Sequence, residues 1–225
     1  MQYFLDSADV SKIQAVLAQY PCDGVTTNPT ILARDAKDPG AALRKIRKLL
    51  GNKLLFAQVT AKTAPEMISQ AEALAAALGA PISIKIPATK EGVLAMKTLA
   101  VRGISVTATA VYTPQQALLC GKAGADYVAP YVSHIDNLGI DAAAVVGEMA
   151  ELLAAYCPHT CVLAASFRTV EQVNRVLFAG AGAVTITAEM FDLLIGSAGT
   201  AAEVGSFEKN WSAAFGEKEI TDFWG

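Results

Sequence analysis

The sequence has few residues of the kinds that build metal sites or disulfide frameworks. It contains only two histidines, His134 and His159, so a catalytic metal site built from histidines is effectively excluded. The cysteines follow neither a disulfide nor a zinc-knuckle spacing, and they are Cys22, Cys120, Cys157 and Cys161. We expect small buried thiols in a reducing compartment and no metal.

The chain also lacks long apolar runs, a secretory start and a basic stripe. Although 53% of the residues are hydrophobic, charged residues, glycine or proline interrupt every apolar run before it could span a bilayer. Residues 1–6 have neither the basic start nor the apolar core of a signal sequence. A net charge of −3 argues against nucleic-acid binding. We therefore expect a cytoplasmic protein with no membrane and no nucleic-acid partner.

Strand-like and helix-like segments alternate regularly along the chain. The high hydrophobic content suits a parallel sheet that is buried on both faces. The expected strands span residues 3–6, 24–27, 54–59, 82–86, 105–110, 127–131, 161–165 and 183–187. The expected helices span residues 10–20, 41–50, 64–78, 91–102, 114–123, 141–156, 170–179 and 188–195. This pattern predicts an α/β protein with a single (β/α)8 TIM barrel, and a doubly wound open sheet is the alternative.

One further helix is expected after the eighth unit, at residues 200–215, with Phe207, Trp211 and Phe215 on one face. No change of composition marks a linker, so residues 1–225 are expected to form one domain in which 200–225 is a helical extension. A barrel needs no ninth helix. The extension either caps its own barrel or docks on a neighbouring subunit, and we favour the neighbour.

A lysine stands inside the fourth expected strand. Because side chains alternate along a strand, Ile82, Ile84 and Ile86 share one face, while Ser83 and Lys85 share the other. A buried lysine tends to lose its proton, and a neutral amine is a nucleophile towards carbonyl groups. The alternative is a lysine that reaches solvent or pairs with a carboxylate.

Polar residues recur at or just beyond the carboxyl ends of the expected strands, the face that carries the active site in (β/α)8 enzymes. In the fifth strand Ser105, Thr107 and Thr109 share one side, which predicts that the polar side faces the barrel interior. The strand-end set is Asp6, Asn28, Gln58, Lys85, Thr109, Tyr131, Ser166 and Thr187. These residues predict an active site around Lys85, and a polar plug that satisfies its own hydrogen bonds is the alternative.

Seven motifs in this order resemble the transaldolase family, and most closely its small fructose-6-phosphate aldolase branch. The motifs are FLD at 4–6, GVTTNP at 24–29, FAQV at 56–59, IKIP at 84–87, TAVY at 109–112, VAPYV at 128–132 and AASFR at 164–168. The resemblance runs from the first strand to the C-terminal helix. It implies a cofactor-free class I aldolase in which a lysine of the fourth strand forms a Schiff base with a ketose.

The resemblance also implies a role for each matching residue. Lys85 would be the Schiff-base nucleophile, in a dry setting that the flanking isoleucines help to provide. A water held by Gln58, Thr109 and Tyr131 would shuttle protons, with Tyr131 as the acid/base. Asp6 would contact substrate hydroxyls and assist proton movement. The substrate-binding residues would be Asn28, Thr26, Ala129, Ser166, Arg168 and His134.

Two of these positions bear on the branch of the family. Transaldolases proper usually have a glutamate at the position of Gln58 and a phenylalanine at that of Tyr131. The glutamine and tyrosine here favour an aldolase, with a transaldolase as the alternative and a non-catalytic sugar-binding barrel as a further one.

Phosphate recognition is expected to be weak. Ser166 and Arg168 follow the seventh strand, where barrels often bind phosphate. His134 stands where the family commonly has a second arginine, and a histidine offers fewer donors. The substrate would be a sugar or a sugar phosphate, and we expect either weaker discrimination for phosphorylated acceptors or a preference for non-phosphorylated sugars and aldehydes. The resemblance also implies a homo-oligomer, a decamer of stacked pentameric rings.

Overall fold

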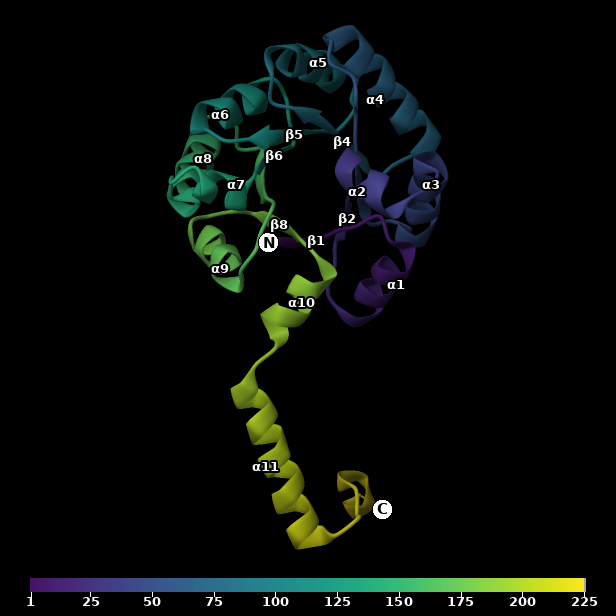
Figure 1. The fold of residues 1–225 in the computed structure, drawn as a ribbon, viewed down its shortest axis with the longest axis vertical. Coiled ribbons are helices and arrows are strands. Elements are labelled where there is room, and N and C mark those ends of the chain that lie inside the picture. Colours follow the sequence, from purple (N-terminus) through teal and green to yellow (C-terminus); the bar gives the residue numbers. More distant parts are fainter. Residues whose placement is uncertain (225) are drawn as a thin grey trace. The chain divides into compact units, whose positions relative to one another are not determined.

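Eight short apolar strands, all parallel, form the centre of the protein. The computed structural model describes residues 1–224. The strands are β1 (Gln2–Asp6), β2 (Gly24–Thr26), β3 (Leu54–Gln58), β4 (Ile82–Pro87), β5 (Val106–Val111), β6 (Tyr127–Pro130), β7 (Cys161–Ala164) and β8 (Ala183–Ile186). They pair in sequence order and β8 pairs with β1, so the sheet closes into a barrel (Figure 1). The predicted (β/α)8 barrel is confirmed.

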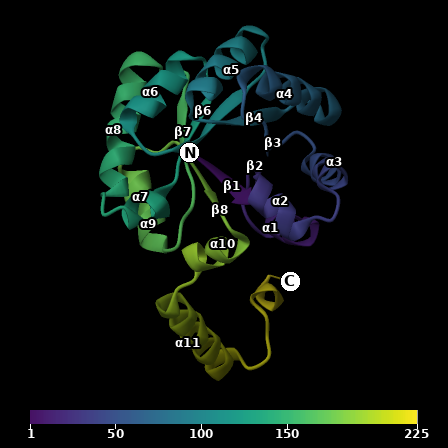
Figure 2. The same cartoon turned by 45° about the horizontal axis from the view of Figure 1, so that its top comes forward.

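Helices follow the strands and cover the outside of the barrel, as Figures 1 and 2 show. Those that match the sequence prediction are α1 (Val10–Gln19), α3 (Pro39–Leu50), α4 (Ala64–Leu78), α5 (Lys90–Val101), α6 (Pro114–Lys122), α8 (Ala142–Tyr156), α9 (Val170–Phe178) and α10 (Ala188–Ile195). Their starts follow from local chemistry. Asp9 accepts from the backbone N–H groups of Ser11 and Lys12 at 2.9 and 3.2 Å to cap α1, and Thr113 and Gln116 form a capping box at α6.

Two short helices lie where the sequence predicts loop or strand end. α2 (Pro29–Asp35) follows β2, and α7 (Val132–Asn137) follows β6. Both are too short to show a helical repeat of apolar residues. The start of α2 does carry a signal, because Asn28 followed by Pro29 is a typical helix cap and first position.

The barrel interior is layered. The lower half is apolar, with the cluster Phe4, Phe56, Leu163 and Ala183 fully buried, and Tyr127 packs against it. The rings of Phe4 and Phe56 meet edge to face at 4.9 Å between centroids. Two residues further along, three of these strands carry the polar residues Asp6, Gln58 and Thr185, whereas β7 is followed by Ala165. The barrel interior is therefore filled by apolar side chains in its lower half and lined mainly by polar side chains at the carboxyl ends of the strands.

The chain divides into a unit Met1–Phe191 and a second that begins at Asp192. The second contains α11 (Ala198–Phe215) and a 3-10 helix, Ile220–Phe223. The expected additional C-terminal helix is thus confirmed, two residues longer at its start. Within this unit Trp211 packs on Phe215 and Phe223, with ring centroids 4.7 and 6.0 Å apart.

All four cysteines are free, and Cys22, Cys120 and Cys157 are buried, as expected for small core thiols. No helix among residues 1–224 combines the length and hydrophobicity needed to cross a membrane.

Substitution of Gly24 tests how closely the backbone of β2 approaches that of β3. A methyl group on Gly24 would lie 2.0 Å from the backbone oxygen of Leu54, whereas one on Gly147 in α8 would lie 3.7 Å from its nearest neighbour. We expect Gly24→Ala to lower the free energy of unfolding by about 3 kcal/mol or more, because a backbone strand must shift. Gly147→Ala should leave it unchanged or raise it by up to about 1 kcal/mol. Denaturant unfolding measures both, and equal losses in the two variants would contradict the register.

Candidate active site

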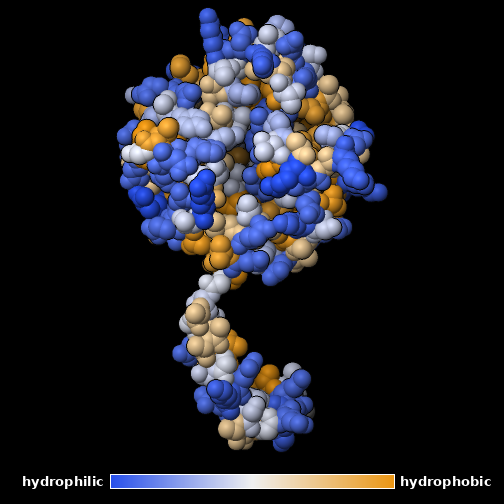
Figure 3. Space-filling model, in the orientation of Figure 1, coloured by the Kyte–Doolittle hydropathy of each residue, from blue (hydrophilic) through white to orange (hydrophobic). Residues whose placement is uncertain are grey.

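A cavity of about 430 Å³ opens at the carboxyl ends of the strands. Its volume is within the range typical of small-molecule sites. It is lined by Asp6, Asn28, Pro29, Thr30, Ile31, Arg34, Gln58, Lys85, Tyr131, His134, Ala165, Ser166, Thr185 and Thr187. Figure 3 shows a hydrophilic surface over the helices and a hollow with paler side chains near the middle of the barrel face. Eight of the residues expected at the site from the sequence therefore share one cavity: Asp6, Asn28, Gln58, Lys85, Tyr131, His134, Ser166 and Thr187.

Lys85 is the only lysine in this lining, and its side chain is buried at 5% exposure. Its Nζ donates to the backbone oxygen of Thr27 at 3.1 Å. Burial lowers the pKa of Lys85, and the negative charge of Asp6 opposes part of that shift. Removal from water therefore favours the neutral amine that nucleophilic attack requires.

The dry setting of Lys85 does not come from its isoleucine neighbours. Ile84 and Ile86 are fully buried, but they point to the opposite side of β4, where a methyl of Ile86 lies against Gly92 of α5. On the side of Lys85, Ser83 shares a hydrogen bond of 2.7 Å with Thr107 of β5. Enclosure within the barrel, rather than apolar contact, desolvates the amine.

Asp6 lies at the end of β1 and faces the same cavity. Its Oδ1 accepts from the hydroxyl of Thr26 at 2.7 Å, and Thr26 is in turn 2.6 Å from the hydroxyl of Thr185. Burial raises the pKa of Asp6, while Lys85, Thr26 and Arg34 each oppose the rise. Thr26 does not line the cavity; it holds the carboxyl in place from below.

Thr109 and Tyr131 form a pair at the ends of β5 and β6. The threonine hydroxyl and the phenol are 3.0 Å apart. Burial raises the pKa of Tyr131, and the Thr109 hydrogen bond opposes the rise, so the phenol stays protonated and can donate. Ala110 follows with a φ of 54°, and the register of β5 against β6 shifts there. The strained residue turns the strand end next to the pair.

Gln58 offers a hydrogen-bond acceptor to a ligand, and Asn28 offers a hydrogen-bond donor. The Oε1 of Gln58 is buried and has no hydrogen-bond partner among residues 1–224, so it can accept from a bound hydroxyl or water. The Oδ1 of Asn28 accepts from the N–H of Ile31 at 2.9 Å to cap α2. That bond turns the amide so that its NH₂ group remains for a ligand.

The residues expected to recognise phosphate do not all meet. Ser166, at a φ of 64°, is 2.8 Å from the hydroxyl of Ser133, and His134 packs on Tyr131 with ring centroids 5.4 Å apart. Both line the cavity. Arg168 is exposed and outside it, with its backbone N–H bound to Gln172. Ala129 is buried and lies two residues before Tyr131 on the same face of β6.

The sequence prediction missed Arg34 and Thr185 in the lining. Thr185 lies two residues before Thr187, the residue that was expected at the strand end. Because side chains alternate along a strand, both residues face inward. Arg34 was missed because its segment was taken for a loop. Once Pro29 is recognised as the first residue of a helix, Ile31 and Arg34 lie three apart on one helical face.

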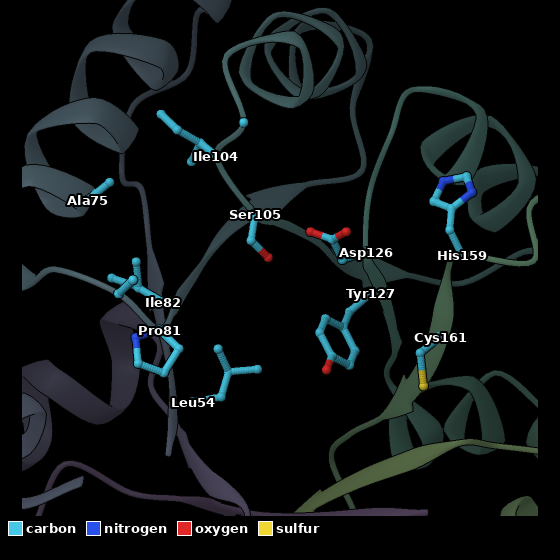
Figure 4. A pocket seen from close by; sticks show the side chains of 12 residues that line it. Leu54, Ala75, Pro81, Ile82, Ile104, Ser105, Asp126, Tyr127, His159 and Cys161 are labelled. Carbon is cyan, nitrogen blue, oxygen red and sulfur yellow. The ribbon is translucent and has the colours of Figure 1, made fainter. Parts of the chain in front are cut away.

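A second cavity, of about 700 Å³, lies at the amino ends of the strands (Figure 4). It is lined by the first residues of β3, β4, β6 and β7 and by the preceding loops, with Asp126, His159 and Cys161 among them. Burial raises the pKa of the Cys161 thiol, which disfavours the reactive thiolate. The buried lysine and its proton-carrying neighbours are at the other end.

A closed parallel barrel with a desolvated lysine, a buried carboxyl and a phenol at the carboxyl ends of its strands defines a barrel enzyme of the kind that acts through an amine. Residues 3–222 match the model of the transaldolase/fructose-6-phosphate aldolase family. The chain belongs to this family, whose members are aldolase-type enzymes that act through a Schiff base.

Burial lowers the pKa of Lys85 and the charge of Asp6 raises it. These opposite effects predict what happens when the Asp6 charge is removed. Because that charge favours the protonated amine, Asp6→Asn should lower the pKa of Lys85 further and move its labelling midpoint to lower pH. Acetylation of Lys85 across a pH series, followed by peptide mass analysis, measures the midpoint. Glu148→Gln, a matched loss of one charge on the exposed side of α8, should leave the midpoint in place. A rise in the Asp6→Asn variant would refute the electrostatic argument.

Proposed function

We propose that the protein is a class I aldolase that reversibly cleaves a ketose such as fructose 6-phosphate into a dihydroxyacetone-type donor and an aldehyde such as glyceraldehyde 3-phosphate. The observation that carries the proposal is the buried amine of Lys85, which faces a cavity together with Asp6 and the Thr109–Tyr131 pair. A cytoplasmic location is part of the proposal.

In the first step the lone pair of the Lys85 amine attacks the ketose carbonyl carbon. One proton passes from the attacking nitrogen to the carbonyl oxygen to give a carbinolamine, a second proton then reaches the same oxygen, which leaves as water, and an iminium ion remains. Tyr131 supplies the second proton through a water held between the phenol, Thr109 and Gln58. The raised pKa of Tyr131 keeps the proton on the phenol until it is needed.

In the second step the carbon–carbon bond breaks. Asp6 takes the proton of the hydroxyl that becomes the aldehyde, and the bonding electrons move into the iminium to give an enamine. The amide NH₂ of Asn28 holds a hydroxyl of the three-carbon unit. The proton that Asp6 took passes through the same water to the Tyr131 phenolate, and Tyr131 then protonates the enamine carbon. Hydrolysis of the resulting iminium by one water releases the donor, restores the free amine and returns a proton to Tyr131.

Tyr131 and Gln58 favour release of the three-carbon unit over its transfer to a second aldehyde. A phenol beside the enamine adds a proton donor, whereas a phenylalanine could not protonate the three-carbon unit. The enamine is then discharged to water rather than kept for a second aldehyde. A transaldolase that passes the unit between sugar phosphates is the competing function.

Reduction with borohydride tests the proposal. In the presence of dihydroxyacetone we expect a three-carbon adduct on the peptide that contains Lys85, and free dihydroxyacetone from fructose 6-phosphate without an added acceptor. Lys85→Met should abolish both while leaving the circular dichroism spectrum unchanged, because the side chain fits the same space without an amine. A transaldolase would give the adduct but release little donor, and a non-catalytic sugar-binding barrel would give no adduct.

We also propose that the full chain forms one functional domain whose C-terminal extension joins it to a second copy in a homo-oligomer, a decamer of stacked pentameric rings by family resemblance. The large apolar side chains of the extension support this. Val204, Phe207, Phe215, Ile220, Phe223 and Trp224 are each at least 45% exposed in the single chain. Contact with another copy would remove this apolar surface from water.

Truncation after Ile195 should therefore reduce the mass of the protein in solution to that of smaller assemblies, as measured by light scattering. Phe207→Asp should weaken assembly in the full chain, because it places a charge in an apolar contact. Ser206→Asp, one residue away on α11, adds the same charge and serves as the control. An unchanged mass after truncation would count against the extension as an assembly element.

A further inference from the structure

We infer that Arg34, on the first turns after β2, is the residue that recognises the anionic end of a phosphorylated substrate. The inference rests on the proposed aldolase function and adds a specificity-determining residue to it. It replaces the expectation of weak phosphate discrimination that follows from His134 alone.

The cavity lining contains one lysine, Lys85, and one arginine, Arg34. In the proposed mechanism the amine of Lys85 bonds to the carbonyl carbon of the substrate, and burial favours its neutral form. Arg34 is thus the one guanidinium that lines the cavity among the described residues. Arg168, which the family resemblance assigns to phosphate, is exposed and absent from the lining.

Local structure aims Arg34 at the cavity. Asn28 caps α2 through its bond to the Ile31 N–H, so the helix begins at the cavity wall. Ile31 and Arg34 are three residues apart and both line the cavity. The donor-holding amide and the guanidinium therefore stand about one and a half helical turns apart on a single rigid element.

Asp35 orients the guanidinium. Its Oδ1 and Oδ2 accept from Nε and Nη2 of Arg34 at 2.6 and 2.8 Å. This leaves Nη1 without a hydrogen-bond partner among residues 1–224. The guanidinium is held by its rear edge, while the remaining N–H groups can meet the oxygens of a phosphate ester. The Arg34 side chain is 67% exposed, as expected for a residue at the opening of the cavity rather than at its base.

The space beside Arg34 extends beyond the main cavity. A smaller cavity of about 250 Å³ shares Asp6, Arg34 and Thr187 with the main one. Its other cation, Lys12, is paired with Glu189 at 2.5 Å. The acidic residues there would repel an anion placed deep in this space. The phosphate therefore meets Arg34 from the side of the main cavity rather than inside the smaller one.

His134, on α7 across the barrel from α2 (Figure 1), and Ser166 also line the cavity. A serine hydroxyl and an imidazole can bind a sugar hydroxyl, but neither offers the paired N–H donors that a guanidinium presents to phosphate. We assign these two residues to hydroxyl contacts, so they and Arg34 carry different chemistry.

The test fixes dihydroxyacetone as the donor and compares glyceraldehyde 3-phosphate with glyceraldehyde as the acceptor. The readout is the ratio of kcat/KM for the two acceptors in the wild type, Arg34→Gln and Arg44→Gln. Arg44 is exposed on α3 and outside the cavity, so its variant controls for the loss of one positive charge. We expect a wild-type ratio that favours the phosphate, a fall of at least about tenfold in Arg34→Gln, carried by KM, and no change in Arg44→Gln.

Borohydride trapping of dihydroxyacetone separates this inference from the function on which it rests. An adduct in Arg34→Gln together with a reduced ratio supports the role of Arg34. An adduct with an unchanged ratio, or a wild type that does not prefer the phosphate, overturns that role and leaves the aldolase chemistry standing. No adduct even in the wild type overturns the proposed function, and the inference falls with it.

Discussion

The chemistry that we propose for this protein depends on removing one amine from water without giving it a close counter-ion. Lys85 is enclosed by the barrel and bonded to a backbone oxygen rather than to a carboxylate. Asp6 is near enough to influence its pKa, yet Asp6 is itself desolvated and bonded to Thr26. Burial thus acts in opposite directions on the two groups and draws both towards their neutral forms. A solvent-exposed lysine would keep its proton and would be a poor nucleophile.

The layered interior explains how the barrel maintains this state. Phe4, Phe56 and Leu163 fill the lower interior, so water cannot reach the amine from the amino ends of the strands. Towards the carboxyl ends of the strands, several inward-facing residues are polar and bond to one another, as Thr26 does to Asp6 and Thr109 to Tyr131. The second cavity lies on the far side of the apolar side chains and is isolated from the lysine.

The short helices after β2 and β6 give the mouth its shape. α2 carries an amide at its cap and a guanidinium near its end, and α7 presents His134 opposite. A (β/α)8 scaffold supplies the strand ends, and these insertions decide which substrate groups are met there. In the proposed function, the strand ends thus carry the chemistry at the base of the cavity, and the two short helices carry the specificity at its opening.

The sequence by itself determined the barrel, because strand and helix periods repeat eight times, and it determined Lys85, Asp6, Gln58 and Tyr131 as neighbours, because parallel strands bring their carboxyl ends together. It could not place Arg34, since a helix of two turns leaves no readable repeat. It also attributed part of the dry setting of the lysine to the adjacent isoleucines, which lie on the other face of the strand. Only the tertiary structure decided these points, because enclosure and the direction of a short helix depend on contacts between residues far apart in the chain.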